Sequence, residues 1–136
     1  MNVLEPFVRQ WAALLVTFRR DGAPVGTPVS IVVEDDHAYF RTWSTSGKMK
    51  RIRSNPEVEI SPSTALGKKT GLALRGRVRT LKDGEAAHAS RLLSRKHPLL
   101  HRFLVPMAHR LRGYETVHLE LIPYGEPAGE VREDGP

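Results

Sequence analysis

The chain has 136 residues, which is enough for one domain with a core of its own. Hydrophobic residues make up 40% and charged residues 26% of it, a globular composition that excludes a disordered or fibrous chain. The absence of cysteine excludes disulfides, thiolate metal ligands and thiol catalysis, and the formal net charge of +6 indicates an anionic partner of some kind.

The first half of the chain is typical of an antiparallel meander that follows a short helix over residues 2–10. Asp21 and Gly22 predict a hairpin turn, because glycine accepts the positive φ that such a turn requires. Pro24 and Pro28 lack a backbone N–H, so the first half of the strand that carries them belongs at a sheet edge or a bulge. The three strands expected here cover residues 12–18, 24–34 and 38–42.

The second half alternates helices and strands. A polar turn precedes a short helix that Asn55 and Pro56 terminate, and either Thr80 or Asp83 could cap the helix after it. Helices are expected over residues 48–54, 85–94 and 99–109. Strands are expected at residues 58–60, 72–80 and 114–122, with a loop over residues 61–71. About six short strands predict a small barrel in a fold that is mostly β with short helices (α+β).

This pattern divides the chain into three parts. We expect a lead-in helix over residues 1–10, a barrel domain over residues 11–123 and a flexible acidic tail over residues 124–136. No window holds eighteen apolar residues in a row, and the first residues do not form an export signal, so a cytoplasmic location is expected.

The segment that could carry chemistry runs from residue 40 to residue 53. A strand leads into a bend with Ser44, Thr45 and Ser46, and a helix follows that opens with Gly47 and Lys48. Unpaired N–H groups and the positive dipole end of a helix start can hold an anion, and hydroxyls and a lysine strengthen such a site. The segment therefore predicts a phosphate cradle, although the spacing of a nucleotide P-loop is absent.

A plainer interpretation of the same segment is a capped surface helix whose charges keep the protein soluble. Trp43 also has two interpretations, and the plainer one is a core or rim residue, which a tryptophan at a strand end usually is. Its functional alternative is a wall against a flat ring beside the phosphate.

Most of the chain, about residues 10–123, resembles the pyridoxamine 5′-phosphate oxidase-like, flavin-reductase split-barrel superfamily. The resemblance rests on the order of an apolar strand, a turn with Asp21 and Gly22, a strand with Thr27 and Pro28, an aromatic strand and a basic helix start. The residues 42–44 and 47–51 are most similar to the group that depends on the deazaflavin coenzyme F420. A split β-barrel of about six antiparallel strands is the fold that this resemblance implies.

The resemblance also implies roles for individual residues. Lys48 matches the basic position that binds phosphate in the family. Lys50 and Arg51 lie near it, and the resemblance does not decide which of the two points inward. The loop over residues 62–71 would border the ring. The expected cofactor-binding residues are Thr27, Pro28, Val29, Thr42, Trp43, Ser44, Ser46, Gly47, Lys48, Lys50 and Arg51. The family forms homodimers with cofactor sites at the interface, so a partner chain is expected to complete each site.

The expected function is a coenzyme F420-dependent oxidoreductase that transfers a hydride between the reduced cofactor and a small organic acceptor. No catalytic side chain is expected, because the cofactor performs this chemistry and the protein binds and orients it. One alternative is an FMN-binding oxidase or reductase in the same fold, and another is a protein that binds a cofactor without turnover.

Two other functions have weaker support. Arg75, Arg77 and Arg79 share one strand face, which leaves a basic nucleic-acid-binding module as a distant alternative. His97 and His101 have the spacing of metal ligands on a helix, but Pro98 lies between them and no carboxylate completes the set. We therefore expect no metal site and no membrane partner.

Overall fold

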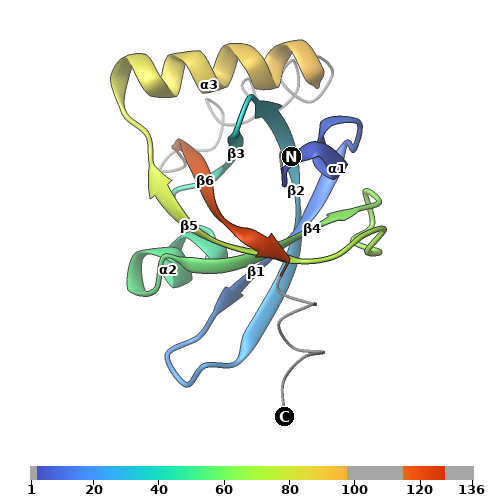
Figure 1. Ribbon diagram of the computed structural model, residues 1–136. Helices are drawn as coiled ribbons and strands as arrows, with labels where there is room; N and C mark the ends of the chain where they lie inside the picture. The colour runs from blue at the N-terminus through green and yellow to red at the C-terminus, as the bar shows by residue number, and fades with distance from the viewer. Residues whose placement is uncertain (1–2, 98–114, 128–136) are drawn as a thin grey trace.

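The computed structural model describes residues 3–97 and 115–127 and shows six antiparallel strands that close into a barrel (Figure 1). Around the barrel the strands follow the order β1-β2-β3-β6-β5-β4. The strands are β1 (Ala12–Phe18), β2 (Pro24–Glu34), β3 (His37–Trp43), β4 (Glu57–Ser63), β5 (Leu74–Thr80) and β6 (Thr116–Pro127). The helices are α1 (Glu5–Val8), α2 (Gly47–Ser54) and α3 (Asp83–Lys96). The predicted fold, a mostly β split barrel of about six strands with short helices, is confirmed.

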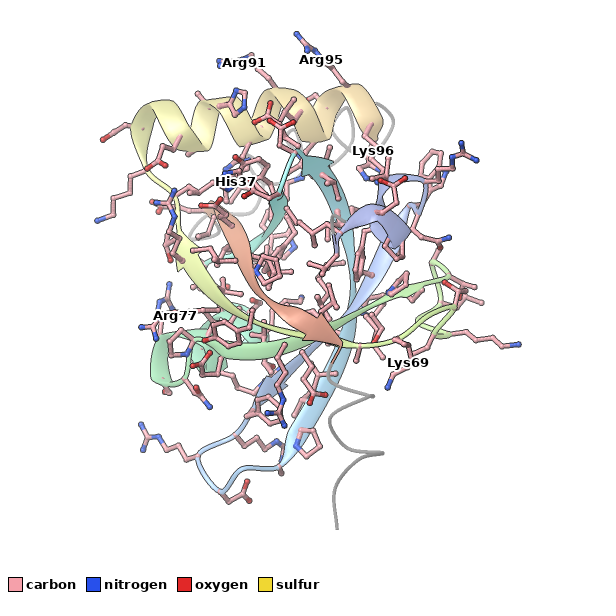
Figure 2. All side chains as sticks on the ribbon, viewed as in Figure 1. His37, Lys69, Arg77, Arg91, Arg95 and Lys96 are labelled. Carbon is pink, nitrogen blue, oxygen red and sulfur yellow. The ribbon has the colours of Figure 1, made fainter. Side chains whose placement is uncertain are left out.

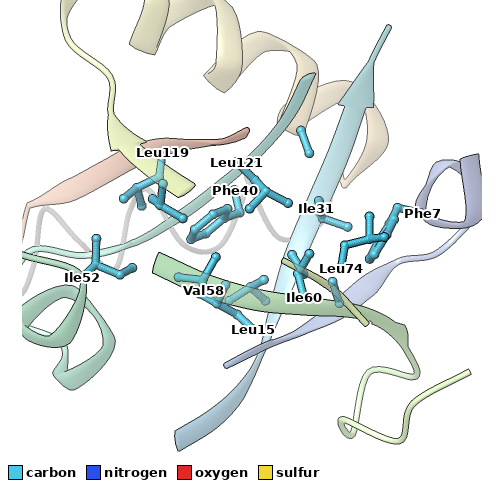
Figure 3. Close-up of a cluster of buried hydrophobic side chains, with 14 of the residues drawn as sticks. Phe7, Leu15, Ile31, Phe40, Ile52, Val58, Ile60, Leu74, Leu119 and Leu121 are labelled. Atoms are coloured by element: carbon cyan, nitrogen blue, oxygen red, sulfur yellow. The ribbon is translucent and has the colours of Figure 1, made fainter. Parts of the chain in front are cut away.

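The barrel interior is filled by side chains that alternate along the strands. Phe40, Leu15, Ile31, Ile60 and Leu121 are fully buried and meet in one cluster (Figure 3). Successive side chains of a strand point to opposite faces, so an apolar residue at every second position supplies a continuous core. Met49 and Ile52 of α2 join the same cluster, so the core also holds the helix against the barrel.

The pairing of β2 changes along its length. The strand pairs with β1 over residues 24–30 but with β3 only over residues 31–34. Pro24 and Pro28 lie in the part that lacks β3, where a missing backbone N–H costs no ladder hydrogen bond on that side. The predicted sheet edge is thus confirmed, and the barrel is split beside residues 24–30.

Helix α3 packs across the strands through Ala89 and Leu93, which contact a second buried cluster that includes Val32 and Tyr39. The helix is longer than the 85–94 predicted, and neither Thr80 nor Asp83 caps it. Lys82 occupies the cap position and makes no side-chain cap hydrogen bond. The cap prediction fails because packing on the barrel, rather than local capping, stabilises this helix.

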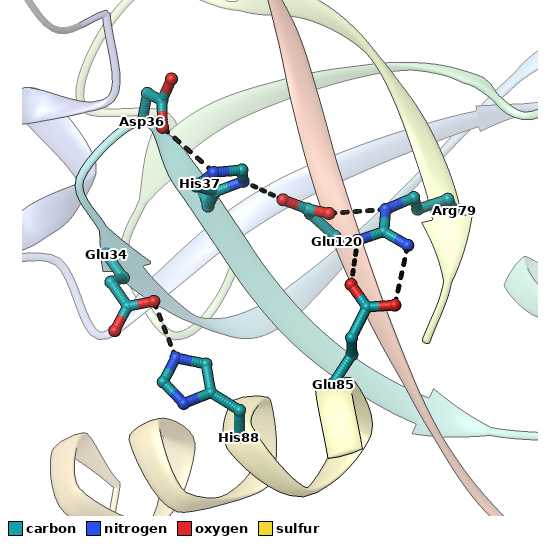
Figure 4. A network of polar contacts seen from close by, with 7 residues as sticks. All are labelled: Glu34, Asp36, His37, Arg79, Glu85, His88 and Glu120. Atoms are coloured by element: carbon teal, nitrogen blue, oxygen red, sulfur yellow. Dashed lines mark hydrogen bonds and ion pairs between the residues drawn. The ribbon is translucent and has the colours of Figure 1, made fainter. Parts of the chain in front are cut away.

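A network of charged side chains joins α3 to the barrel (Figure 4). Glu120 is only 2% exposed, and it accepts from Arg79 Nε at 2.6 Å and from His37. Arg79 also donates to both carboxylate oxygens of Glu85, at 3.3 and 2.5 Å, while His88 Nε2 lies 2.7 Å from a Glu34 oxygen. A buried carboxylate is tolerated only when charged donors satisfy it, so these contacts fix the helix.

The network changes the interpretation of the basic strand face. Arg79 is engaged with two carboxylates, and Arg75 Nε lies 3.9 Å from an oxygen of Glu59. Fewer of the three arginines on this strand face are therefore available to bind nucleic acid than the sequence indicates. On the outer side of α3, Arg91 and Arg95 point away from the barrel (Figure 2).

The end of the last strand differs from the prediction. Strand β6 continues beyond residue 123, where the predicted barrel ends, and reaches Pro127. Its last residue pairs with Leu74 of β5 across an irregularity between Leu74 and Gly76, so the extension belongs to the sheet. The helix predicted over residues 99–109 and the tail from residue 128 lie outside the described residues.

The close approach of β5 and β6 leads to a stability prediction. A Cβ added at Gly76 would lie 2.8 Å from the carbonyl oxygen of Ile122, whereas one added at Gly84 of α3 meets nothing within 4 Å. We expect Gly76→Ala to lower the free energy of unfolding by about 1–3 kcal/mol, because the strands must separate. Gly84→Ala is the control and should leave it unchanged or raise it by up to about 1 kcal/mol. Urea unfolding measures both, and equal effects would contradict the packing described.

A second stability prediction concerns Lys96 at the end of α3 (Figure 2). Its Nζ donates to the carbonyl oxygen of Phe7 at 3.2 Å. Burial lowers the pKa of Lys96 from 10.5 to about 8. Between these values the unfolded chain binds the proton that the folded protein releases, so stability should rise as the pH rises from about 8 to about 10.5.

We expect Lys96→Met to flatten this rise, and the exposed Lys68→Met to keep it. Denaturant unfolding across the pH range measures the effect. A rise that persists in Lys96→Met would assign it to another group.

Candidate functional site

Two half-buried cations lie together on α2. Arg51 Nε donates to Thr17 Oγ1 of β1 at 2.6 Å, which turns the guanidinium toward the barrel. Burial and then the charge of Arg51 lower the pKa of Lys48. Among the described side chains, those of residues 3–97 and 115–124, neither cation forms an ion pair with a carboxylate. The arrangement therefore lacks the counter-charge that a protein normally gives to buried cations.

The position of Lys48 on the helix is also unfavourable for a cation. Lys48 is the second residue of α2, and a cation is unfavourable at the positive end of the helix dipole. Gly47 precedes it, and a Cβ at Gly47 would lie 2.9 Å from Arg51 Nη1. The missing side chain thus lets the guanidinium fold back over the first turn. A negative group bound here would offset three unfavourable effects together: the burial of the two cations, the repulsion between them, and the position of Lys48 at the positive end of the helix dipole.

The hydroxyls of the bend hold the helix start in place. Ser46 caps α2 by accepting from Met49 N at 3.1 Å, and its Oγ lies 3.0 Å from Thr42 Oγ1. Ser44 Oγ accepts from Glu115 N at 3.3 Å, and its carbonyl oxygen accepts from Arg53 Nη1. The predicted hydroxyls therefore have a structural task first, which leaves the cations and the helix start as the main contacts for an anion.

Thr27 lies on the split edge of β2 in a position that fits this interpretation. It pairs with Leu15, while Thr17 pairs with Val25, so the side chains of Thr17 and Thr27 are diagonal neighbours on the inner face. The Oγ1 atom of Thr27 is buried and has no hydrogen-bond partner among the described residues. Buried hydroxyls are nearly always paired, so this atom is available to bind a polar group of a ligand.

The same strand borders a hollow of about 240 Å³ on the outer face. Pro28 and Val29, both predicted, line this hollow, and so does Ala65 from the loop that was expected to border the ring. The complete lining is Trp11, Ala12, Pro28, Val29, Ser30 and Ala65. Sequence reasoning missed Trp11, although a tryptophan directly before an apolar strand was a signal that could have found it.

The remaining predicted residues lie away from this hollow or face solvent. Trp43 is half-buried at the end of β3, where it pairs with Thr116, and it is not among the residues that line the hollow. Lys50 is exposed, whereas Arg51 turns to Thr17. The orientation that the sequence left open between these two residues is therefore inward for Arg51.

A larger hollow of about 420 Å³ lies elsewhere, on the outer side of β4 and β5. Its lining includes Phe18, Tyr124 and the carboxylates of Glu57 and Glu59, and Tyr124 donates to Glu57. Arg75 also lines it but is close to Glu59, so two carboxylates face one cation there and this hollow suits the predicted phosphate less well.

The two histidines with metal-ligand spacing cannot be compared as a pair. His97 is buried, and His101 lies outside the described residues. Within residues 3–97 and 115–127, no three His, Asp or Glu side chains gather as metal ligands would. In the same part of the chain, no helix is long and apolar enough to cross a bilayer.

The family model described as pyridoxamine 5′-phosphate oxidase matches residues 3–114, which is most of the chain. This protein belongs to the pyridoxamine 5′-phosphate oxidase family. A comparison with curated proteins found no match. The family assignment therefore rests on the match of the chain to the family model and on the barrel.

Solved structures with the same fold have different functions. An F420 reductase covers 90% of this chain and 93% of its own length, with 19% identity and a TM-score of 0.62. An FAD-binding protein from Mesorhizobium loti covers 88% and 84%, with 17% identity and a TM-score of 0.63. A haem storage protein from Vibrio cholerae covers 93% of both chains, with 14% identity and a TM-score of 0.62. At these identities the likeness shows a shared fold.

The uncompensated charge on α2 leads to a stability prediction. We expect Lys48→Met to raise the free energy of unfolding of the cofactor-free protein by about 0.5–2 kcal/mol, because it removes a half-buried cation from beside Arg51. Lys50→Met on the exposed side of α2 is the matched control and should stay within about 0.5 kcal/mol. Urea unfolding at neutral pH measures both, and destabilisation by Lys48→Met would mean that the lysine is satisfied within the chain.

Proposed function

We propose that this family member is an oxidoreductase that binds coenzyme F420 and transfers a hydride between the reduced cofactor and a small organic acceptor. The observation that carries the proposal is the pair of Lys48 and Arg51, two half-buried cations with no carboxylate partner among the described residues. The buried, unpartnered Oγ1 of Thr27 supports it from the neighbouring strand.

These residues fit the phosphate of a flavin or deazaflavin. Lys48 would contribute a point charge, Arg51 a guanidinium anchored on Thr17, and Thr27 a hydroxyl donor. The N–H groups at the start of α2 would add the partial positive charge of the helix. The phosphate would in this way supply the negative charge that the described part of the chain does not place beside these two cations.

The hollow beside Pro28 and Val29 fits the other end of such a cofactor. Its lining is mostly apolar, and it begins one residue along β2 from Thr27. A planar apolar ring could therefore lie outside the barrel while its phosphate enters at the split. The bound cofactor supplies the hydride chemistry, so the protein has to bind it, orient it and exclude water.

The choice of F420 over FMN rests on charge and on the resemblance of residues 42–44 and 47–51 to the F420-dependent group. F420 carries a polyglutamate tail, and the loop next to the ring hollow carries the exposed Lys68 and Lys69. FMN in the same cradle is the alternative, since its phosphate needs the same two cations. Storage or carriage of a cofactor without turnover is the alternative from another class, because one protein with this fold is a haem storage protein.

We propose further that two copies of the chain form a homodimer that completes the ring site. The hollow of about 240 Å³ is small and open, and the loop beside it presents Leu66 at 96% and Leu72 at 52% exposure. Exposed apolar side chains beside a ligand hollow favour burial by a second surface. Sedimentation velocity measures the oligomeric state, and a monomer that binds cofactor at full affinity would contradict the homodimer.

A paired titration with F420 and FMN tests the function. We expect F420 to bind more tightly than FMN, and Lys48→Ala to weaken binding by about 10- to 150-fold, the scale of one charge-assisted hydrogen bond. Lys50→Ala on the same helix is the control and should change affinity by less than about twofold.

Three outcomes would contradict parts of the proposal. Tighter binding of FMN would favour the alternative cofactor, and failure of both to bind would exclude the cofactor site. Binding without oxidation of the reduced cofactor by any tested acceptor would favour the carrier function.

A further inference from the structure

Trp11 is held in an unusual way for a side chain that is 60% exposed. Its indole meets the ring of His97 edge to face, with the ring centroids 5.3 Å apart and the planes at 66°. His97 is 0% exposed and lies at the end of α3. A large ring at the surface thus rests on a fully buried partner, whereas an isolated surface tryptophan would be free to change rotamer.

The buried histidine is itself anchored to the split strand. His97 Nε2 lies 3.0 Å from the carbonyl oxygen of Ile31, which can only accept, so Nε2 carries the proton. Ile31 is the first residue of β2 that pairs with β3, where the split begins. Nδ1 is buried and has no hydrogen-bond partner among the described residues, and burial lowers the pKa of His97, so the ring under Trp11 is neutral at neutral pH.

Trp11 also borders the candidate ring site. Trp11 lines the same hollow as Pro28, Val29 and Ala65, so it comes from a third segment of the chain, at the start of β1. Indole is the largest aromatic face in this lining, and offset stacking on a planar ring is favourable beyond the area that it buries. The aromatic wall that the sequence assigned to Trp43 is therefore available from Trp11 instead.

We propose that Trp11 stacks on the planar ring of the bound cofactor and that His97 is the positioning residue that holds its indole in place. The inference rests on the proposed function, since it needs a flavin-type ring in this hollow. It adds a contact residue that neither the resemblance nor the family assignment supplied. It also explains why a helix across the barrel ends against the strand that borders the site.

The two tryptophans of the chain make a direct test possible. Indole in van der Waals contact with a flavin quenches the flavin's emission, and a phenyl ring does not. We expect FMN, used as the probe, to lose its emission on binding to the wild type and to Trp43→Phe. It should recover emission when bound to Trp11→Phe. Trp11→Ala should weaken binding of FMN and of F420 by about 10-fold or more, the scale of losing an aromatic stacking partner.

The role of His97 is tested by two substitutions that remove different contacts. His97→Phe keeps an aromatic edge under Trp11 but loses the hydrogen bond to Ile31, so bound FMN should stay quenched. His97→Gln can keep that hydrogen bond but removes the ring, so FMN emission should partly recover. A purely structural role for His97 would follow the hydrogen bond and give the opposite order. Circular dichroism checks that each variant is folded.

The outcomes separate this inference from the proposed function. Tight cofactor binding with FMN still quenched in Trp11→Phe, and with affinity unchanged in Trp11→Ala, would overturn the role of Trp11 and leave the function standing. Failure of FMN and F420 to bind the wild type would overturn both. Recovery of emission in Trp43→Phe, with quenching kept in Trp11→Phe, would return the aromatic wall to Trp43.

Discussion

The pairing of β2 is the constraint on which the rest of this molecule depends. Residues 24–30 of the strand pair with β1, whereas only residues 31–34, from Ile31 onward, pair with β3. Pro24 and Pro28 permit the difference, because they offer no donors to a second neighbour. Residues 24–30 therefore form an edge on the side that lacks β3, and this segment carries Thr27, Pro28 and Val29 of the candidate site.

The site is built at a cost to the fold. Lys48 and Arg51 are half-buried near each other, and Lys48 stands at the positive end of a helix dipole. The core offsets this cost, because Met49 and Ile52 of the same helix are buried in the barrel core, and Ser46 caps the helix. Fold and site thus share α2, which supplies both core side chains and the two cations.

Helix α3 connects to the site from the other side of the barrel. The carboxylates of Glu120 and Glu85 bind Arg79 and fix the start of the helix, while His97 joins its end to Ile31. The ring of His97 at the end of this helix contacts the indole of Trp11. In the proposed site, the contacts that fix the helix would therefore also support the position of Trp11.

The sequence by itself determined the elements whose signals are local. Alternating apolar residues gave the strands, Asp21 and Gly22 the hairpin, the two prolines the edge, and Asn55 and Pro56 the end of α2, since each acts through its own backbone geometry. The cap of α3 and the end of β6 at Pro127 depend on packing and pairing with distant segments, so local signals missed them. Only the tertiary structure decided that Arg51 turns inward while Lys50 does not, and that Trp11 rather than Trp43 borders the hollow. These orientations depend on contacts between residues that are far apart in the sequence, and local sequence patterns contain no information about such contacts.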